Sequence, residues 1–286
     1  MKSRIRIMII SLFIFNVLVY ANYMNVNAVA ISIISISIIF LATTFGSSFV
    51  FFFKKEFGAK TNNVILGFAG GIMISASIFG LILPSISESK TLYPDIAYLP
   101  PILGFLGGGL LLYLMDKLIP HFHHNTGVEE GKASHLDKNL KFFLAVTIHN
   151  IPEGLSVGFA CGMALKGGTS DLMYGALSLA IGIAIQNIPE GAAVSIPMFG
   201  DGEKKGKAFL FGAMSGVVEP LFAVVGLFLA QLSFITPWLL AFAAGAMFYV
   251  TLDEILPESR KEHYEHYGLW SFMIGFALMM LLELIF

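Results

Sequence analysis

The stretch TIHNIPEG, residues 147–154, decides how the rest of this sequence is read. It carries a histidine, an asparagine, a proline and a glutamate, yet it lies in the middle of a long apolar segment. Nearly the same letters return at residues 184–191 as AIQNIPEG. A single polar residue in an apolar helix usually makes a hydrogen bond between helices. A duplicated block with a glutamate in each copy favours a functional site instead.

The composition around these two blocks is that of a membrane protein. The chain has 286 residues, of which 56% are hydrophobic and only 13% charged, whereas a soluble domain carries about 25% charged residues. The net charge of −2 and the absence of a basic stretch argue against a nucleic-acid partner. The single cysteine, Cys161, excludes an internal disulfide and a cysteine-based zinc site, and its apolar neighbours indicate a small packing residue.

Nine apolar segments are close to the ~20 residues that a helix needs to cross a bilayer. They cover residues 5–24, 29–53, 63–83, 101–119, 140–162, 173–196, 208–230, 237–256 and 268–286. Because none alternates apolar and polar residues, the sequence predicts an all-α polytopic bundle rather than a barrel, in one domain over 1–286. The sequence predicts eight transmembrane helices after residue 28. Residues 1–28 form either an extra N-terminal helix or a signal segment.

The lysines and arginines predict the orientation in a cell membrane. With the N-terminus in the cytoplasm, fifteen of the seventeen lie inside, and only Lys90 and Lys166 lie outside. This asymmetry is a strong positive-inside signal. It places the loops 120–139, 199–207 and 257–267 in the cytoplasm and the C-terminus on the opposite side.

Read as helices, the two blocks bring polar side chains to one depth. His149 and Glu153 are one turn apart and share a face, and Gln186 and Glu190 repeat this spacing. Because the two helices run antiparallel, a rise of ~1.5 Å per residue places all four near the middle of the bilayer. Glu219, in the sequence GVVEPL of the next segment, falls at the same depth. The full set is His149, Asn150, Glu153, Gln186, Asn187, Glu190 and Glu219.

Three carboxylates at this depth need compensation, because each acidic residue at a helix centre costs about 2.5–3.5 kcal/mol on insertion. No lysine or arginine falls nearby, so the carboxylates must be compensated either by protonation or by a bound cation. An imidazole, carboxylates and amide oxygens suit a divalent first-row metal better than a proton relay. Pro152, Pro189 and Pro220 each lack the N–H of a helical bond and free a carbonyl that can line such a site. Antiparallel copies of one motif also predict an inverted repeat, as in many secondary transporters.

The pair HNIPEG and QNIPEG, followed by the glutamate of VEP, resembles the ZIP (Zrt/Irt-like) family of divalent metal transporters over nearly the whole chain. The second block opens with glutamine instead of histidine, and in this respect the chain resembles the GufA-like branch of the family. The resemblance implies uptake of zinc, with iron, manganese and cadmium as further substrates, through a binuclear site into the cytoplasm. The ion is cargo, and no cofactor is implied. The resemblance also implies a helix bundle that moves against a homodimeric scaffold.

The resemblance further implies roles for single residues. The first metal site would hold His149, Glu153, Gln186 and Glu190, and the second Asn150, Asn187 and Glu219, with Glu153 and Glu190 bridging the two. Some members carry aspartate in place of Asn187, so the second site here has less negative charge. At the cytoplasmic mouth, an exit site is implied at Asp116, Asp253 and Glu254, for which ordinary helix-end acids are the alternative. The run HFHH resembles a metal-collecting loop, or is a solvated loop, and contains His121, His123 and His124.

Two other functions fit part of the pattern. An intramembrane metal-dependent hydrolase needs several histidines and an open position for water. Only His149 of the seven histidines lies at membrane depth, and no HExxH motif is present. A proton-coupled carrier of another solute would use the three glutamates but leaves His149 and the three amides unexplained. The sequence therefore favours a transporter over an enzyme.

Overall fold

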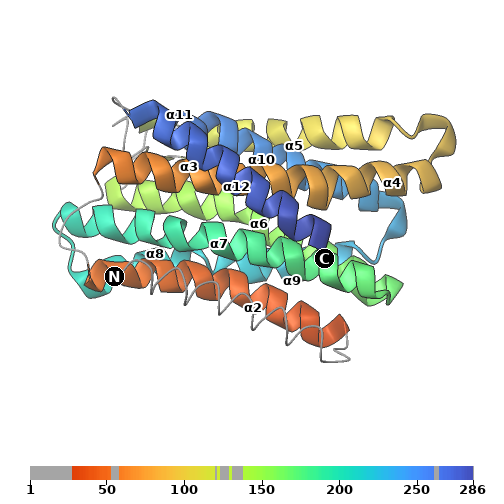
Figure 1. The fold of residues 1–286 in the computed structure, drawn as a ribbon, viewed down its shortest axis with the longest axis horizontal. Coiled ribbons are helices and arrows are strands. Elements are labelled where there is room, and N and C mark those ends of the chain that lie inside the picture. The colour runs from red at the N-terminus through yellow and green to blue at the C-terminus, as the bar shows by residue number, and fades with distance from the viewer. Residues whose placement is uncertain are drawn as a thin grey trace.

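The computed structural model describes residues 28–52, 58–119, 121–122, 129–130, 138–260 and 264–285. In these ranges the chain forms a bundle of long helices that run along one axis and reverse at its two ends (Figure 1). The longer helices are α2 (Ala28–Ser47), α3 (Ala59–Ala76), α4 (Leu83–Leu92), α5 (Leu99–Leu118), α6 (Lys138–Gly167), α7 (Ser170–Gly200), α8 (Lys205–Ser215), α9 (Val218–Leu229), α10 (Thr236–Val250) and α12 (Glu265–Ile285). The short ones are η1 (Ser48–Phe51), η2 (Ser77–Ile82), η3 (Pro94–Ile96), η4 (Ser233–Ile235), η5 (Thr251–Ile255) and α11 (Leu256–Glu258).

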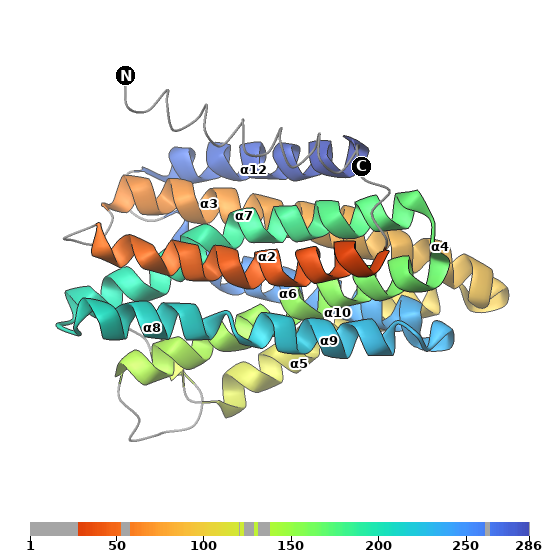
Figure 2. The ribbon, with the colours of Figure 1, turned by 90° about the horizontal axis from the view of Figure 1, so that it is seen from below.

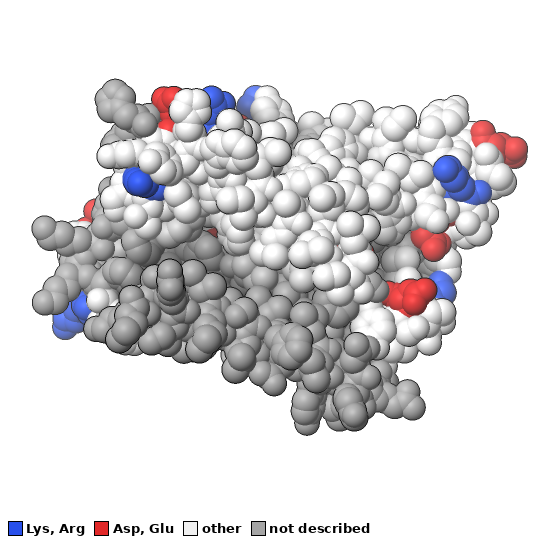
Figure 3. Space-filling model, viewed as in Figure 1, with Lys and Arg blue, Asp and Glu red and all other residues white. Residues whose placement is uncertain are grey.

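The predicted helical membrane fold is confirmed. Seven stretches of the described residues are long and apolar enough to cross a membrane: Ala28–Phe51, Ala59–Leu92, Leu99–Leu118, Ser170–Gly200, Lys205–Leu229, Ser233–Glu258 and Glu265–Ile285. On the face drawn in Figure 3, the charged side chains of the described residues gather at the two ends and leave a broad uncharged band between them. The predicted segment 5–24 lies outside the described residues.

The helix α6 is the remaining candidate for an eighth span. It has 30 residues, enough to cross a bilayer, but it is not among the seven stretches. Its buried polar residues, among them Lys141, His149 and Glu153, lower its hydropathy. The count of eight transmembrane helices therefore stays a prediction.

The helices pack in two groups. α2 packs on α7, α9 packs on α6, and α6 lies beside α7. We call these helices, with α8, the motif bundle, because α6, α7 and α9 carry the predicted site. α3 packs on α12, and α10 packs on α5; we call these four the frame bundle. The two bundles meet where α7 lies between α2 and α3 (Figure 2).

Two parts of the frame bundle are built alike, as expected for an inverted repeat. α3 continues through the π-helical segment η2 into α4, and α10 continues through the π-helical segment η5 into α11. A proline follows each π-helical segment two residues later, at Pro84 and Pro257. Because proline cannot supply the N–H of an α-helical bond, the bonding pattern before it shifts. The packing of α3 on α12 matches that of α10 on α5 in the same way.

Two short strands lie in the connection between α5 and α6. β1 (His121–Phe122) and β2 (Glu129–Glu130) pair antiparallel, with His121 opposite Glu130. The sequence predicted a loop over 120–139, and the structure adds this short two-stranded pairing within it. His123 and His124 lie outside the described residues.

Candidate metal centre

The seven predicted ligands come from three helices of the motif bundle. α6 carries His149, Asn150 and Glu153, α7 carries Gln186, Asn187 and Glu190, and α9 carries Glu219 in its first turn. Five of these residues are at most 1% exposed, namely Asn150, Glu153, Gln186, Asn187 and Glu219. His149 is 9% exposed, and Glu190 is partly buried. The seven therefore lie inside the bundle and not on its lipid-facing surface.

Prolines shape the backbone around these ligands in two ways. α6 and α7 continue as helices past Pro152 and Pro189. By contrast, the stretch before Pro220 breaks the helix, so that α8 ends at Ser215 and α9 begins at Val218. The carbonyl of Gly216, which we expected Pro220 to leave free, accepts a hydrogen bond from the N–H of Glu219 at 3.1 Å. This turn places Glu219 at the start of a helix.

The amide side chains donate their N–H groups to the protein. Gln186 Nε2 donates a short hydrogen bond to Glu153 Oε1. Asn150 Nδ2 donates to the carbonyl oxygen of Ser215 and to Glu219 Oε1, each at 3.2 Å. Asn187 Nδ2 lies 3.5 Å from the carbonyl oxygen of Ile39 in α2. In each of these contacts the amide nitrogen is the donor and the oxygen of the same amide remains as an acceptor.

Several carboxylate and amide oxygens of the predicted ligands accept no hydrogen bond from the residues that the structure describes. Buried oxygen atoms normally accept at least one hydrogen bond. Here six side chains each keep one buried oxygen that accepts none from the described part of the chain: Asn150 Oδ1, Glu153 Oε2, Gln186 Oε1, Asn187 Oδ1, Glu190 Oε1 and Glu219 Oε2. Such a set of carboxylate and amide oxygens is suited to a divalent cation.

The charges of the candidate site also favour a cation as partner. Glu153 interacts electrostatically with Glu190 and Glu219, and Glu190 with His149. Three carboxylates that share a buried site repel one another strongly, because the surrounding dielectric is low. A cation between them converts this repulsion into attraction, and additional oxygen ligands then complete its shell.

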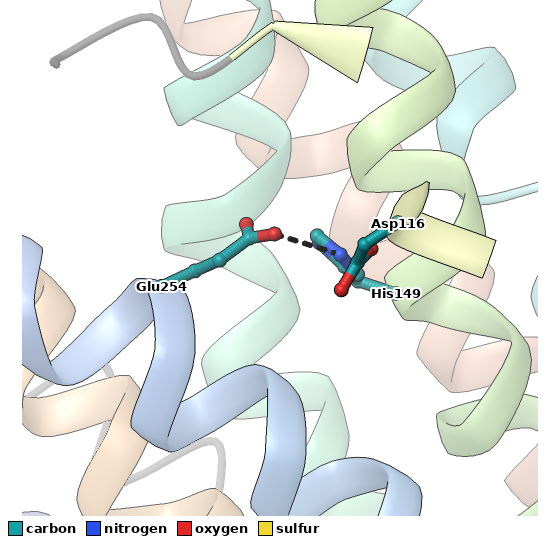
Figure 4. A group of neighbouring side chains, drawn as sticks. All are labelled: Asp116, His149 and Glu254. Atoms are coloured by element: carbon teal, nitrogen blue, oxygen red, sulfur yellow. Dashed lines mark ion pairs between the residues drawn. The ribbon is translucent and has the colours of Figure 1, made fainter. Parts of the chain in front are cut away.

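A second group of possible metal ligands lies beside the first. Asp116 of α5, His149 of α6 and Glu254 of η5 each offer an atom within 4.8 Å of the others. Their side chains point toward one another, and His149 Nε2 lies 3.0 Å from Glu254 Oε1 (Figure 4). This group brings together residues from both bundles. We call it the inner group.

The inner group differs from the predicted exit site in one member. Asp116 and Glu254 were both predicted, and the structure places them together. Asp253 is exposed and outside the group, because successive residues of a helical turn point in different directions. His149, predicted as a ligand of the first metal site, takes the third position.

One residue near the site was not predicted from the sequence. Thr43 of α2 is fully buried, and its hydroxyl donates to Glu219 Oε1 at 2.7 Å. A threonine in the apolar run LATTFGSS carries no ligand pattern, so only its place beside Glu219 reveals it. Cys161 has no part in the site, since it lies fully buried in the apolar core, as the sequence indicated.

Comparison with known proteins shows to which family the chain belongs. Residues 139–283 match the family described as ZIP zinc transporter. The chain belongs to the ZIP family. It is 32% identical over 319 aligned positions to the zinc transporter ZIP11 of Homo sapiens, covering 84% of this chain and 93% of that one.

Two bacterial relatives from the same comparison are similar over most of their length. The zinc transporter ZIPB of Bordetella bronchiseptica is 34% identical over 232 positions, covering 80% of this chain and 73% of its own. The zinc transporter GufA of Myxococcus xanthus is 35% identical over 234 positions, covering 80% and 89%. The predicted resemblance to this family is therefore confirmed.

Proposed function

We propose that this protein transports divalent metal cations across the cell membrane into the cytoplasm, with zinc as the main substrate and iron, manganese and cadmium as others. One observation carries the proposal: six carboxylate and amide side chains inside the motif bundle each keep a buried oxygen that accepts no hydrogen bond from the described residues. The family and the names of its relatives support the same substrate class.

The predicted ligands divide into two adjacent metal sites. Glu153 and Gln186, joined by their hydrogen bond, hold the first site together with His149 and Glu190. Glu219 and Asn150, also joined by a hydrogen bond, hold the second with Asn187. Glu153 and Glu190 are shared between the two. Three carboxylates neutralise one divalent ion and most of the charge of a second, so two ions at the site need little further compensation.

The inner group provides the next ligands on the cytoplasmic side. With the N-terminus of α3 and the C-terminus of α5 facing the cytoplasm, Asp116 and Glu254 lie between the metal sites and the cytoplasmic end. His149 reaches Glu254 in this structure and is also a ligand of the first site. An ion that leaves the first site therefore keeps the imidazole while it gains two carboxylates.

The direction of transport depends on the orientation that the lysines and arginines predict. A cysteine in place of Lys205, at the start of α8, should be shielded from an impermeant thiol reagent in intact cells. A cysteine in place of Lys90, near the end of α4, should be labelled. Because Cys161 is buried, it contributes little background. Labelling at position 205 but not at 90 would reverse the proposed direction.

The proposed function is tested by zinc uptake into vesicles that contain the purified protein. Glu153→Gln keeps the size of the side chain and removes one charge from both sites, so uptake should fall to the level of empty vesicles. Glu203→Gln is the matched control, since Glu203 lies away from the candidate site and forms a salt bridge with Lys207 at 2.6 Å. If Glu153→Gln transports zinc at the wild-type rate, the motif has a structural role. Uptake of a proton without any metal would favour the carrier of another solute.

A further inference from the structure

Thr43 belongs to a helix that supplies no charged ligand to the site. It lies in α2, it is 0% exposed, and its Oγ1 lies 2.7 Å from Glu219 Oε1 and 3.3 Å from the carbonyl oxygen of Ile39. A hydroxyl has one proton to donate. The shorter distance and the negative charge of the acceptor both favour the bond to Glu219.

This bond determines how Glu219 faces the second metal site. Glu219 Oε1 accepts from Thr43 Oγ1 and, at 3.2 Å, from Asn150 Nδ2. Glu219 Oε2 is buried and accepts no hydrogen bond from the described residues. Two donors on one oxygen hold the carboxylate plane, and the other oxygen is left as the ligand. Without the hydroxyl, this carboxylate would lose the shorter of its two hydrogen bonds at Oε1 and could rotate.

α2 supports the second site specifically. Besides Glu219, it contacts Asn187, whose Nδ2 lies 3.5 Å from the carbonyl oxygen of Ile39. In the first site, Gln186 and Glu153 hold each other by a bond between α7 and α6. The two ligands that are hydrogen-bonded to α2, Glu219 and Asn187, are both assigned to the second site alone.

The packing reserves space for this contact. A Cβ atom placed on Gly216 would lie 2.8 Å from Thr43 Cβ and 3.0 Å from Glu219 Oε1. A side chain at this position would therefore force a shift of Thr43 or of the turn that holds Glu219. The break between α8 and α9 and the absence of a side chain at position 216 together allow α2 to reach the site.

We propose that Thr43 is a positioning residue that sets the affinity of the second metal site through Glu219. This inference rests on the proposed function, because it assumes two metal sites. Glu219 is the one carboxylate assigned to the second site alone, and its neighbour Asn187 is neutral. The second ion therefore depends on the orientation of this carboxylate more than the first ion does on any single group.

The test counts zinc ions bound by the purified, full-length protein during equilibrium dialysis against zinc of known free concentration. Wild type is compared with Thr43→Val, which keeps the shape but removes the hydroxyl, and with Thr43→Ser, which keeps the hydroxyl. Glu219→Gln shows the loss of the second ion. The thermal unfolding midpoint and the elution volume confirm that each variant is folded.

We expect wild type to bind two ions and Thr43→Val to bind the second about tenfold to a hundredfold more weakly, the range for one hydrogen bond to a charged group. Affinity for the first ion should be unchanged, and Thr43→Ser should remain close to wild type. Equal affinities in wild type and Thr43→Val would overturn the inference. So would a loss at both sites that serine does not restore, because that result indicates a packing role.

The wild-type result separates this inference from the proposed function. If wild type binds one ion, and Glu153→Gln removes it, the transport site stands and the role of Thr43 is rejected. If wild type binds none, both proposals fail. Gly216→Ala provides an independent second variant, since it should weaken the second ion in a protein that still has its threonine.

Discussion

The motif bundle and the frame bundle both bring helix backbones into direct contact through glycines. A Cβ on Gly154 of α6 would lie 2.3 Å from the carbonyl oxygen of Glu219 in α9, and one on Gly71 of α3 would lie 2.0 Å from that of Phe272 in α12. In the motif bundle, these contacts lie beside buried carboxylates and amides. In the frame bundle, the buried residues of α3 and α10 are mostly apolar, Met73 and Met247 among them.

The difference shows that close backbone packing alone does not make a site. In both bundles, glycine removes the side chain that would hold two helices apart, which gives dispersion and weak backbone contacts room to act. In the motif bundle the same approach also fixes the separation of charges on different helices. A change at a glycine should therefore affect only stability in the frame bundle, but both stability and metal binding in the motif bundle.

The contact between the two bundles is of a third kind. There, the glycines face the ends of side chains: a Cβ on Gly182 would meet the sulfur of Met279, and one on Gly80 would lie 3.0 Å from Leu179 Cδ1. The ends of such side chains move easily, and methionine is the most adaptable of them. The ion pair of His149 with Glu254 adds a polar contact between the bundles.

The largest expected effect comes from removing a charge in the motif bundle. In Glu190→Gln the shared carboxylate becomes neutral, and the loss of one partner from a buried charge cluster costs about 3–5 kcal/mol. Zinc affinity should fall by a hundredfold or more, on the order of that energy, and uptake should be lost. Glu265→Gln, at an exposed position in the frame bundle, is the control. Dialysis and vesicle uptake measure both quantities, and a wild-type affinity in Glu190→Gln would contradict the assignment.

The matched glycine variants test the comparison of the two bundles directly. Gly154→Ala and Gly71→Ala should each lower the free energy of unfolding by about 1–3 kcal/mol, the usual cost of an overpacked contact. Only Gly154→Ala should also weaken zinc binding, because it displaces Glu219. Denaturant titration and zinc titration of the same samples separate the two effects. Gly182→Ala should be milder in both, since the end of Met279 can move. If Gly71→Ala loses as much zinc affinity as Gly154→Ala, the proposed difference between the two bundles is wrong.

A smaller and metal-dependent effect is expected at the residue that joins the bundles. His149→Ala removes the imidazole from the first site and from the inner group. Zinc uptake should fall by about tenfold or more, and manganese uptake by less, because imidazole suits zinc better than manganese. Uptake assays with each ion alone, normalised to protein content, give the ratio. An equal loss for both ions would indicate that His149 has a structural role.

The smallest effect is expected at the neutral position of the second site. Asn187→Asp adds a carboxylate next to Glu153 and Glu219, which should strengthen binding of the second ion by a few-fold through Coulomb attraction. Transport should persist. Calorimetric titration with zinc measures the affinity. Should both stoichiometry and affinity stay at their wild-type values, Asn187 is not a ligand.

Much of the fold follows from local properties of the sequence. Apolar runs of spanning length predicted the helices of the described residues to within a few residues at most ends, because hydropathy acts segment by segment. Glycine-rich runs in apolar helices are typical of close helix packing, and Gly71 of GFAGG and Gly108 of GFLGGG lie against the backbones of α12 and α10. The break between α8 and α9 was missed, since a glycine and a proline inside an apolar run are compatible with an intact helix.

The candidate ligands could be named from the sequence, whereas their arrangement in space could not. The cost of burying carboxylates and amides is a property of each residue, so the seven candidate ligands were apparent from the sequence, and so was the family. Which helices face one another, by contrast, depends on contacts between residues far apart in the chain. Thr43 and Glu219 are separated by 176 positions, and no local pattern connects them.

The sequence by itself determined that this is a helical membrane protein with a duplicated polar motif, because helix periodicity and the cost of buried charge are both local. Only the tertiary structure decided which oxygen of each ligand is held and which is left free. It also placed His149 beside Glu254 and left Asp253 exposed. These outcomes depend on how α2, α5, η5 and the motif helices are rotated against one another, and that rotation is set by the packing of the whole bundle.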